Sequence, residues 1–60
     1  MNMQDIVKHA HALYEAHGDK AEAEAAQKAT SEASAGNKEE AEKWEKIRAH
    51  IKELRGPRSK

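Results

Sequence analysis

The hydrophobic positions of the chain form two strong stripes, one near each end, and both recur at the spacing of one helical face. A glycine follows each stripe, as is typical where a helix ends. The pattern therefore predicts helices over about residues 3–17 and 38–55. The first stripe consists of Met3, Ile6, Val7, Ala10, Leu13 and Tyr14, and the second of Ala41, Trp44, Ile47, Ile51 and Leu54.

The middle of the chain, residues 20–35, is predicted as a third helix from its composition, because Ala, Glu, Lys and Gln are strong helix formers. It has no large apolar side chain. We therefore expect the stripes of the first and last helices to face each other, with the middle helix against one edge. Its alanines divide into one face with Ala23, Ala26, Ala29 and Ala33, and another with Ala21, Ala25 and Ala35.

Two similar segments separate the helices: HGDKAEAEA at residues 17–25 and AGNKEEAEK at residues 35–43. In each, we interpret the glycine as ending one helix and the Asp or Asn as capping the next, with a Glu one turn later completing a capping box. Fusion of the first two helices through Gly18 is the disfavoured alternative. The predicted boxes are Asp19 with Glu22 and Asn37 with Glu40, and Asn2 is the predicted cap of the first helix.

These elements predict an all-α fold of three short helices, arranged as an antiparallel three-helix bundle or an open helical hairpin. Residues 1–56 form the single domain, and residues 57–60 form a flexible basic tail. A chain of 60 residues is near the lower limit for folding alone. Because its large apolar residues lie only in the outer helices, we expect a homodimer to cover apolar surface that the middle helix leaves open.

Equal numbers of acidic and basic residues hide an uneven distribution of charge. Residues 15–42 contain eight acids and three lysines, whereas residues 43–60 contain seven bases and two acids. The simplest interpretation is that these are solvated helix faces. The alternative is that the basic third binds an anionic ligand or nucleic acid. Its candidate residues are Lys43, Lys46, Arg48, Lys52, Arg55, Arg58 and Lys60.

No spacing along the chain predicts catalysis, a metal site or a cofactor. There is no Cys, and His9 and His11 fall on different sides of the first helix. The glutamates form helical pairs with lysine, such as Glu39 with Lys43, and such small helices leave little room for a concave active site. We therefore expect a non-enzymatic protein without a cofactor. No apolar run predicts a signal peptide or a membrane span, so we expect a cytoplasmic location.

Trp44 is the main candidate for a partner-binding residue. Its place in the middle of the last stripe favours a core anchor, and the alternative is a partly exposed anchor for a partner. Arg48, one turn on, is expected to cover its ring through a cation–π contact. The predicted partner-binding set is Trp44, Arg48, Ile51 and Arg55, and the predicted anion-binding set is Lys43, Lys46, Lys52, Arg58 and Lys60.

The segment ALYEAHGDKAEAEAAQKA, residues 12–29, resembles one turn of a tetratricopeptide repeat. That family joins two helices by a Gly-Asp turn, followed by a small alanine and then a bulky residue. Ala41 and Trp44 fit this pattern better than Ala23 and Ala26 do. Because such repeats have about 34 residues and occur in arrays, the resemblance implies a helical-hairpin interaction surface and no peptide groove. The whole chain is also similar to small bacterial proteins of the alphaproteobacterial type, which share an HGDKAEAE segment and an RGP ending.

We therefore predict a small protein–protein interaction module, acting as a homodimer or as an accessory subunit. The second hypothesis is an accessory protein that binds nucleic acid or another anion through its basic third. The two differ in their response to salt. Nucleic-acid binding weakens steeply as ionic strength rises, whereas an apolar dimer holds or tightens.

Overall fold

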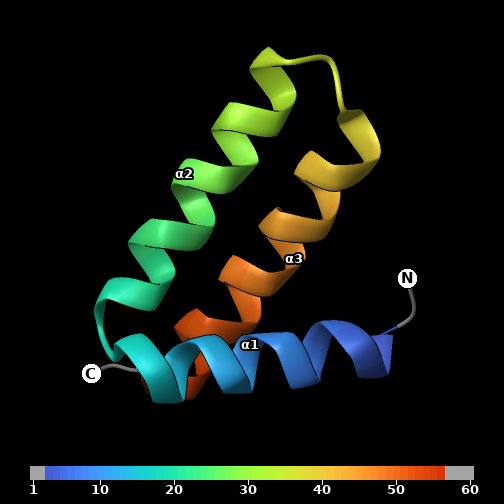
Figure 1. The fold of residues 1–60 in the computed structure, drawn as a ribbon. Helices are drawn as coiled ribbons and strands as arrows, with labels where there is room; N and C mark the ends of the chain where they lie inside the picture. The colour runs from blue at the N-terminus through green and yellow to red at the C-terminus, as the bar shows by residue number, and fades with distance from the viewer. Residues whose placement is uncertain (1–2, 57–60) are drawn as a thin grey trace.

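The computed structural model describes residues 3–56 and is all-α, as the sequence predicts. Its helices begin and end within one residue of the predicted bounds. Helices α2 and α3 lie side by side as an antiparallel hairpin, and α1 crosses the end of this hairpin that lies away from the α2–α3 turn (Figure 1). The predicted Asn2 cap and the predicted tail lie outside the described residues. The helices are α1 Met3–His17, α2 Lys20–Ser34 and α3 Lys38–Leu54.

Gly18 separates α1 from α2, as predicted, and the two helices do not merge. Its φ angle is +60°, in the left-handed region that residues with a side chain rarely adopt. Its N–H donates a hydrogen bond of 2.7 Å to the carbonyl oxygen of Tyr14. This single bond across the last turn of α1 is the simple left-handed helix ending. It redirects the chain so that α1 can cross the hairpin.

Gly36 ends α2 with the two-bond form of the same signal. At a φ of +87°, its N–H donates to the carbonyl oxygen of Ala33 at 3.1 Å, and Asn37 N–H donates to the carbonyl oxygen of Glu32 at 2.8 Å. This pair of bonds is a Schellman motif. The glycine is therefore required by the backbone at this turn.

Asp19 and Asn37 precede α2 and α3 as predicted, but the predicted capping hydrogen bonds are wrong. Neither side chain makes a cap hydrogen bond. Asp19 already has helical backbone angles, whereas a capping residue needs an extended conformation. Its carboxylate lies instead near Arg55. Asn37 Nδ2 donates to Glu32 Oε1 at 2.7 Å, across the α2–α3 turn. These side chains bind groups of neighbouring segments, and hydrogen bonds to charged groups are the stronger kind.

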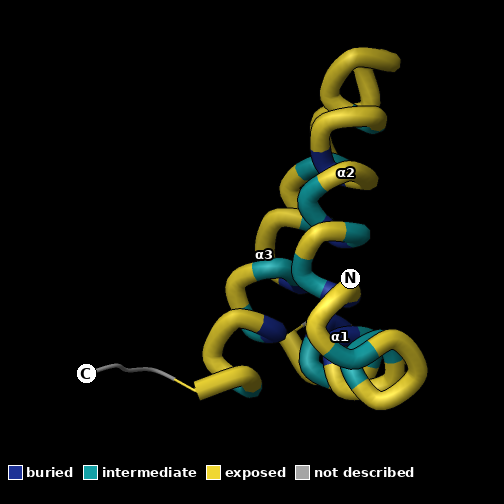
Figure 2. Tube along the Cα trace, turned by 90° about the vertical axis from the view of Figure 1, so that its left-hand side faces the viewer, coloured by how far each residue is buried: buried dark blue, intermediate teal, exposed yellow. Residues whose placement is uncertain are grey.

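The core contains very few large side chains, and it gathers where α1 meets the hairpin (Figure 2). Leu13, Tyr14 and Trp44 pack against it while remaining half-buried. Much of the hairpin nearer its turn is exposed (Figure 2). The buried residues of the described chain are Ile6 and Ala10 of α1, Ala21, Ala25 and Ala29 of α2, and Ile47 and Ile51 of α3.

The expected place of the middle helix is wrong, because α2 is the main neighbour of α3 and the α2–α3 contact is the most extensive of the three. The stripe that α2 buries is Ala21, Ala25 and Ala29, which combines members of both predicted alanine faces. Residues four apart share one side of a helix, and their small methyl groups allow the two backbones to approach closely. Helix α2, which has no large apolar side chain, therefore packs against α3 through the close approach of the two backbones.

Candidate partner-binding surface

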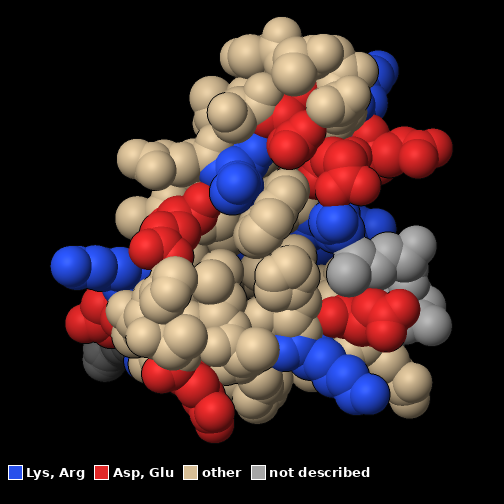
Figure 3. Space-filling model, viewed as in Figure 1, with Lys and Arg blue, Asp and Glu red and all other residues tan. Residues whose placement is uncertain are grey.

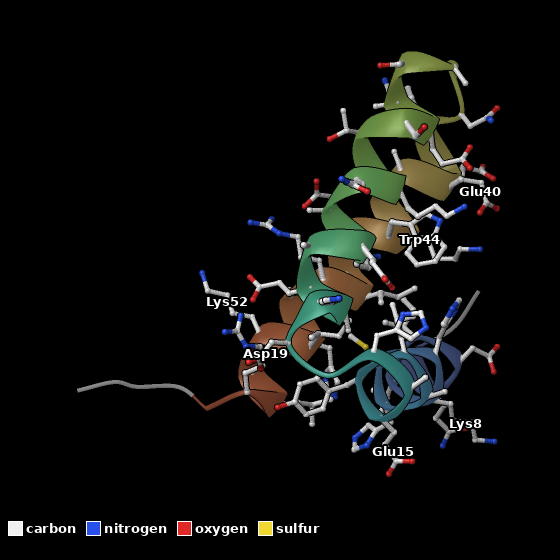
Figure 4. The ribbon with its side chains drawn as sticks, turned by 60° about the vertical axis from the view of Figure 1, so that its left-hand side comes forward. Lys8, Glu15, Asp19, Glu40, Trp44 and Lys52 are labelled. Carbon is white, nitrogen blue, oxygen red and sulfur yellow. The ribbon has the colours of Figure 1, made fainter. Side chains whose placement is uncertain are left out.

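Trp44 lies half-buried on α3, on the side of the hairpin where α1 crosses (Figure 4). The centroid of its ring is 5.1 Å from that of His9, and the two ring planes meet at 64°. This edge-to-face geometry is favourable for aromatic pairs. Trp44 therefore anchors α1 to the hairpin while keeping part of its surface open to solvent. Its packing against the core agrees with the interpretation that the sequence favoured, and its role in binding a partner stays a prediction.

The predicted contact between Arg48 and Trp44 is replaced by a contact with Lys43. Lys43 Nζ lies 6.0 Å from the centroid of the Trp44 ring, at the outer limit of a cation–π contact. Arg48 Nη1 instead donates to Glu45 Oε1 at 3.3 Å, while its Nε is buried without a hydrogen-bond partner. Arg48 lines a shallow hollow against the start of α2, together with Asp19 and Glu22 among others. Because Arg48 lies at the α2–α3 contact, it does not cover the ring of Trp44.

The other two predicted partner-binding residues have structural roles. Ile51 is fully buried, so it fills the core. Arg55, at the end of α3, donates from Nη1 to Glu22 Oε1, and its Nε lies 3.5 Å from Asp19 Oδ1. The hydrogen bond with Glu22 is the main cause that raises the pKa of Arg55, so this guanidinium stays charged throughout the physiological range. Of the four residues, Trp44 offers the largest apolar group at the surface.

The structure does not gather the predicted anion-binding residues into one patch. Lys43 pairs with Glu40 at 2.7 Å, and Lys46 lines a hollow that also contains Glu39 and Glu42. Lys52 lies away from these residues, on the side near Asp19 (Figure 4). Positive and negative groups alternate over the face shown in Figure 3. Arg58 and Lys60 lie outside the described residues.

Apolar surface remains exposed beside the α1–α3 contact. Met3 is 64 % exposed, the largest value for a big apolar side chain in the described part of the chain. It borders a shallow hollow on α3 formed by Lys46, Ala49, His50 and Glu53. Further apolar area is contributed by half-buried side chains, namely Val7, Leu13, Tyr14 and Leu54.

Every histidine of α1 contacts the hairpin, which the sequence did not predict. Besides the His9 contact with Trp44, His17 Nδ1 pairs with Glu24 Oε1 of α2. The rings of His11 and His50 are neighbours, with centroids 5.9 Å apart and planes tilted by 45°. Within residues 3–56, no group of three or more His, Cys, Asp or Glu side chains is arranged to hold a metal. The spacing of histidines along the sequence is uninformative here, because each contact joins two helices.

Comparison with family models, with curated proteins and with solved structures found no match for this chain. None of the helices in residues 3–56 is long and apolar enough to span a lipid bilayer.

Proposed function

We propose that this protein is a non-enzymatic protein–protein interaction module of the cytoplasm, and that it acts as a homodimer. One observation carries the proposal: of the nine large apolar side chains within residues 3–56, only three are buried, and all three are isoleucines. Small domains commonly gain stability by association when their own core is too small. The other six side chains remain partly or largely exposed and are available for contact with another chain. They are Met3, Val7, Leu13, Tyr14, Trp44 and Leu54.

The exposed Met3 and the partly exposed Trp44 are the two proposed contact groups. Aromatic and Met side chains are enriched at interfaces. Both bury a large apolar area, and the unbranched Met side chain adapts its shape to an irregular partner surface. The surrounding charges alternate in sign, which suits a polar rim. A second copy presents the same apolar groups, so a two-fold contact between identical surfaces covers them on both chains.

Sedimentation equilibrium over a range of concentrations tests the dimer. We expect a mass of twice the 6.7 kDa chain at high micromolar concentration, with dissociation on dilution. Met3→Lys places a charge in the proposed contact and should weaken the dimer. Glu15→Gln, on the outer side of α1 away from the hairpin (Figure 4), is the matched control and should leave the dimer unchanged. A 6.7 kDa species at every concentration, with a single cooperative unfolding transition, contradicts the proposal.

Binding of an anionic ligand or nucleic acid is the second hypothesis, and salt separates it from the dimer. Intramolecular pairing of Lys43, Arg48 and Arg55 with carboxylates does not favour it. A gel-shift experiment with generic DNA and RNA at low salt tests it directly. Retardation that disappears at high salt supports nucleic-acid binding, whereas free nucleic acid at all protein concentrations removes it.

A further inference from the structure

His11 and His50 form a cross-helix pair that the fold alone creates. His11 comes from α1 and His50 from α3, and their ring centroids are 5.9 Å apart. His11 is exposed and His50 is half-buried, so solvent reaches the pair. Neither ring has a hydrogen bond to another side chain that fixes its nitrogens, unlike His17, which pairs with Glu24.

From this geometry we propose that His11 and His50 bind one late divalent transition-metal ion, such as Ni²⁺, Cu²⁺ or Zn²⁺. Neutral imidazole suits these ions, whereas Mg²⁺ and Ca²⁺ prefer oxygen ligands. Metal–nitrogen bonds are about 2.0–2.1 Å long, so two rings at 5.9 Å can share an ion after small side-chain rotations. Water completes the coordination, because the described residues supply no third ligand in place.

The charges beside the pair are balanced. Lys46 and Glu53 both border the hollow next to His50, one positive and one negative. The affinity for the ion therefore depends on its two bonds to imidazole nitrogens. The charges of Lys46 and Glu53 offset each other, so they do not attract hard cations such as Mg²⁺. This predicts selectivity by ligand type: late transition metals bind, and Mg²⁺ does not.

Binding of a metal ion at this pair links α1 to the hairpin, because the two ligands come from α1 and α3. The ion binds the folded chain, in which the imidazoles are adjacent, better than the unfolded chain, in which they are 39 positions apart. When the free ion reaches 100 times its dissociation constant, the ratio of folded to unfolded chain should rise about 100-fold. The bound ion thus stabilises the packing of α1 against α3.

The experiment measures Ni²⁺ binding by titration calorimetry and chemical unfolding by circular dichroism, with and without Ni²⁺. We expect one ion per chain and a shift of the unfolding midpoint to higher denaturant. His11→Gln and His50→Gln should each remove both effects. His17→Gln is the matched control: it alters another α1 histidine outside the pair, and it should keep the binding and the shift.

Three results overturn the proposal: equal binding by His17→Gln and both pair variants, binding of Mg²⁺ at the strength of Ni²⁺, or no stabilisation by Ni²⁺. Sedimentation with and without Ni²⁺ provides a further check. We expect the ion to leave the mass of the protein unchanged, whether that protein is a monomer or a dimer. An increase in mass caused by Ni²⁺ indicates bridging between molecules and contradicts the intramolecular site. The site joins helices of one chain, so it does not require the proposed dimer. Because His50 borders the same hollow as Met3, the titration is run at a protein concentration at which the chain is monomeric.

Discussion

Arg55 at the end of α3 donates a hydrogen bond to Glu22 in the first turn of α2, although the two residues are 33 positions apart. In an antiparallel hairpin, the start of one helix lies beside the end of the other. Asp19, also near Arg55, strengthens the link. The ion pair therefore closes the α2–α3 hairpin at the end opposite the Gly36 turn, and it does so where α1 crosses.

Arg55→Gln should lower the midpoint of thermal unfolding, because it removes the charge that joins α3 to the start of α2. The loss should shrink in about 1 M salt, which screens charges at the surface. Glu22→Gln with Arg55→Gln should cost less than the sum of the two single changes, because they remove the same interaction. Additive losses contradict the pairing of Glu22 with Arg55.

The same pair also predicts a pH dependence. Hydrogen bonding to Glu22 raises the pKa of Arg55, so its contribution is complete below the ordinary arginine pKa and is lost only above it. The difference in unfolding midpoint between the wild-type chain and Arg55→Gln should therefore stay constant from neutral pH to about pH 10. Chemical unfolding at a series of pH values measures it, and a difference that fades within this range contradicts the assignment.

Ala25→Leu tests the close contact of α2 and α3. Ala25 is fully buried, so a larger side chain must push the helices apart. Overpacking of this kind costs about 1–3 kcal/mol. The same change at Ala23, which is exposed on the same helix, should be nearly neutral. Urea unfolding of both variants measures the difference, and equal stabilities mean that α2 does not pack through its Ala25 face.

Ile47→Val tests how much the small core depends on each large side chain. Ile47 is fully buried, and removing one methyl group typically costs about 0.5–1.5 kcal/mol. Met3→Ser, at the exposed end of α1, is the control and should change monomer stability by less than about 0.5 kcal/mol. Both are measured by chemical unfolding at low protein concentration. A neutral Ile47→Val places this side chain outside the core.

Gly36→Ala separates backbone strain from steric crowding at the α2–α3 turn. A methyl group at Gly36 meets no other atom within 4 Å, so any cost comes from the left-handed backbone. That cost should be about 1–2 kcal/mol. Gly36→Asn should cost less, because asparagine adopts this conformation more easily. If the two variants are equally stable, the positive φ of Gly36 is not the reason for the glycine.

His9→Ala should expose the indole of Trp44. Because Trp44 is the single tryptophan, its fluorescence reports directly on the seating of α1. We expect a red-shifted emission and stronger acrylamide quenching, with a loss of stability on the order of 1 kcal/mol. His17→Ala, which alters a contact of α1 with α2 instead, should leave the emission unchanged. Identical spectra for His9→Ala and the wild-type chain contradict the ring contact.

The helices and turns were predictable because their causes are local. Apolar spacing predicted α1 and α3, composition predicted α2, and Gly18 and Gly36 marked the turns that connect these three described helices. The buried places of Ile47 and Ile51 also follow from that spacing. Trp44 could be identified as an anchor for the same reason. These features depend on residues within a few positions of one another.

Tertiary structure alone decided which helices pack most closely and which distant side chains meet. The sequence placed α2 at one edge because it has no large apolar side chain, but the contribution of a small side chain depends on how closely another helix approaches it. Asp19 and Glu22 read as a local cap, but Arg55 supplied a charged partner from the far end of the hairpin. The pairing of His11 with His50 has no local signal either. Helix formation is set by neighbours in the chain, whereas these contacts depend on how whole helices pack. The alanine stripe and Arg55 depend on the pairing of α2 with α3, and the pairing of His11 with His50 depends on how α1 crosses the hairpin.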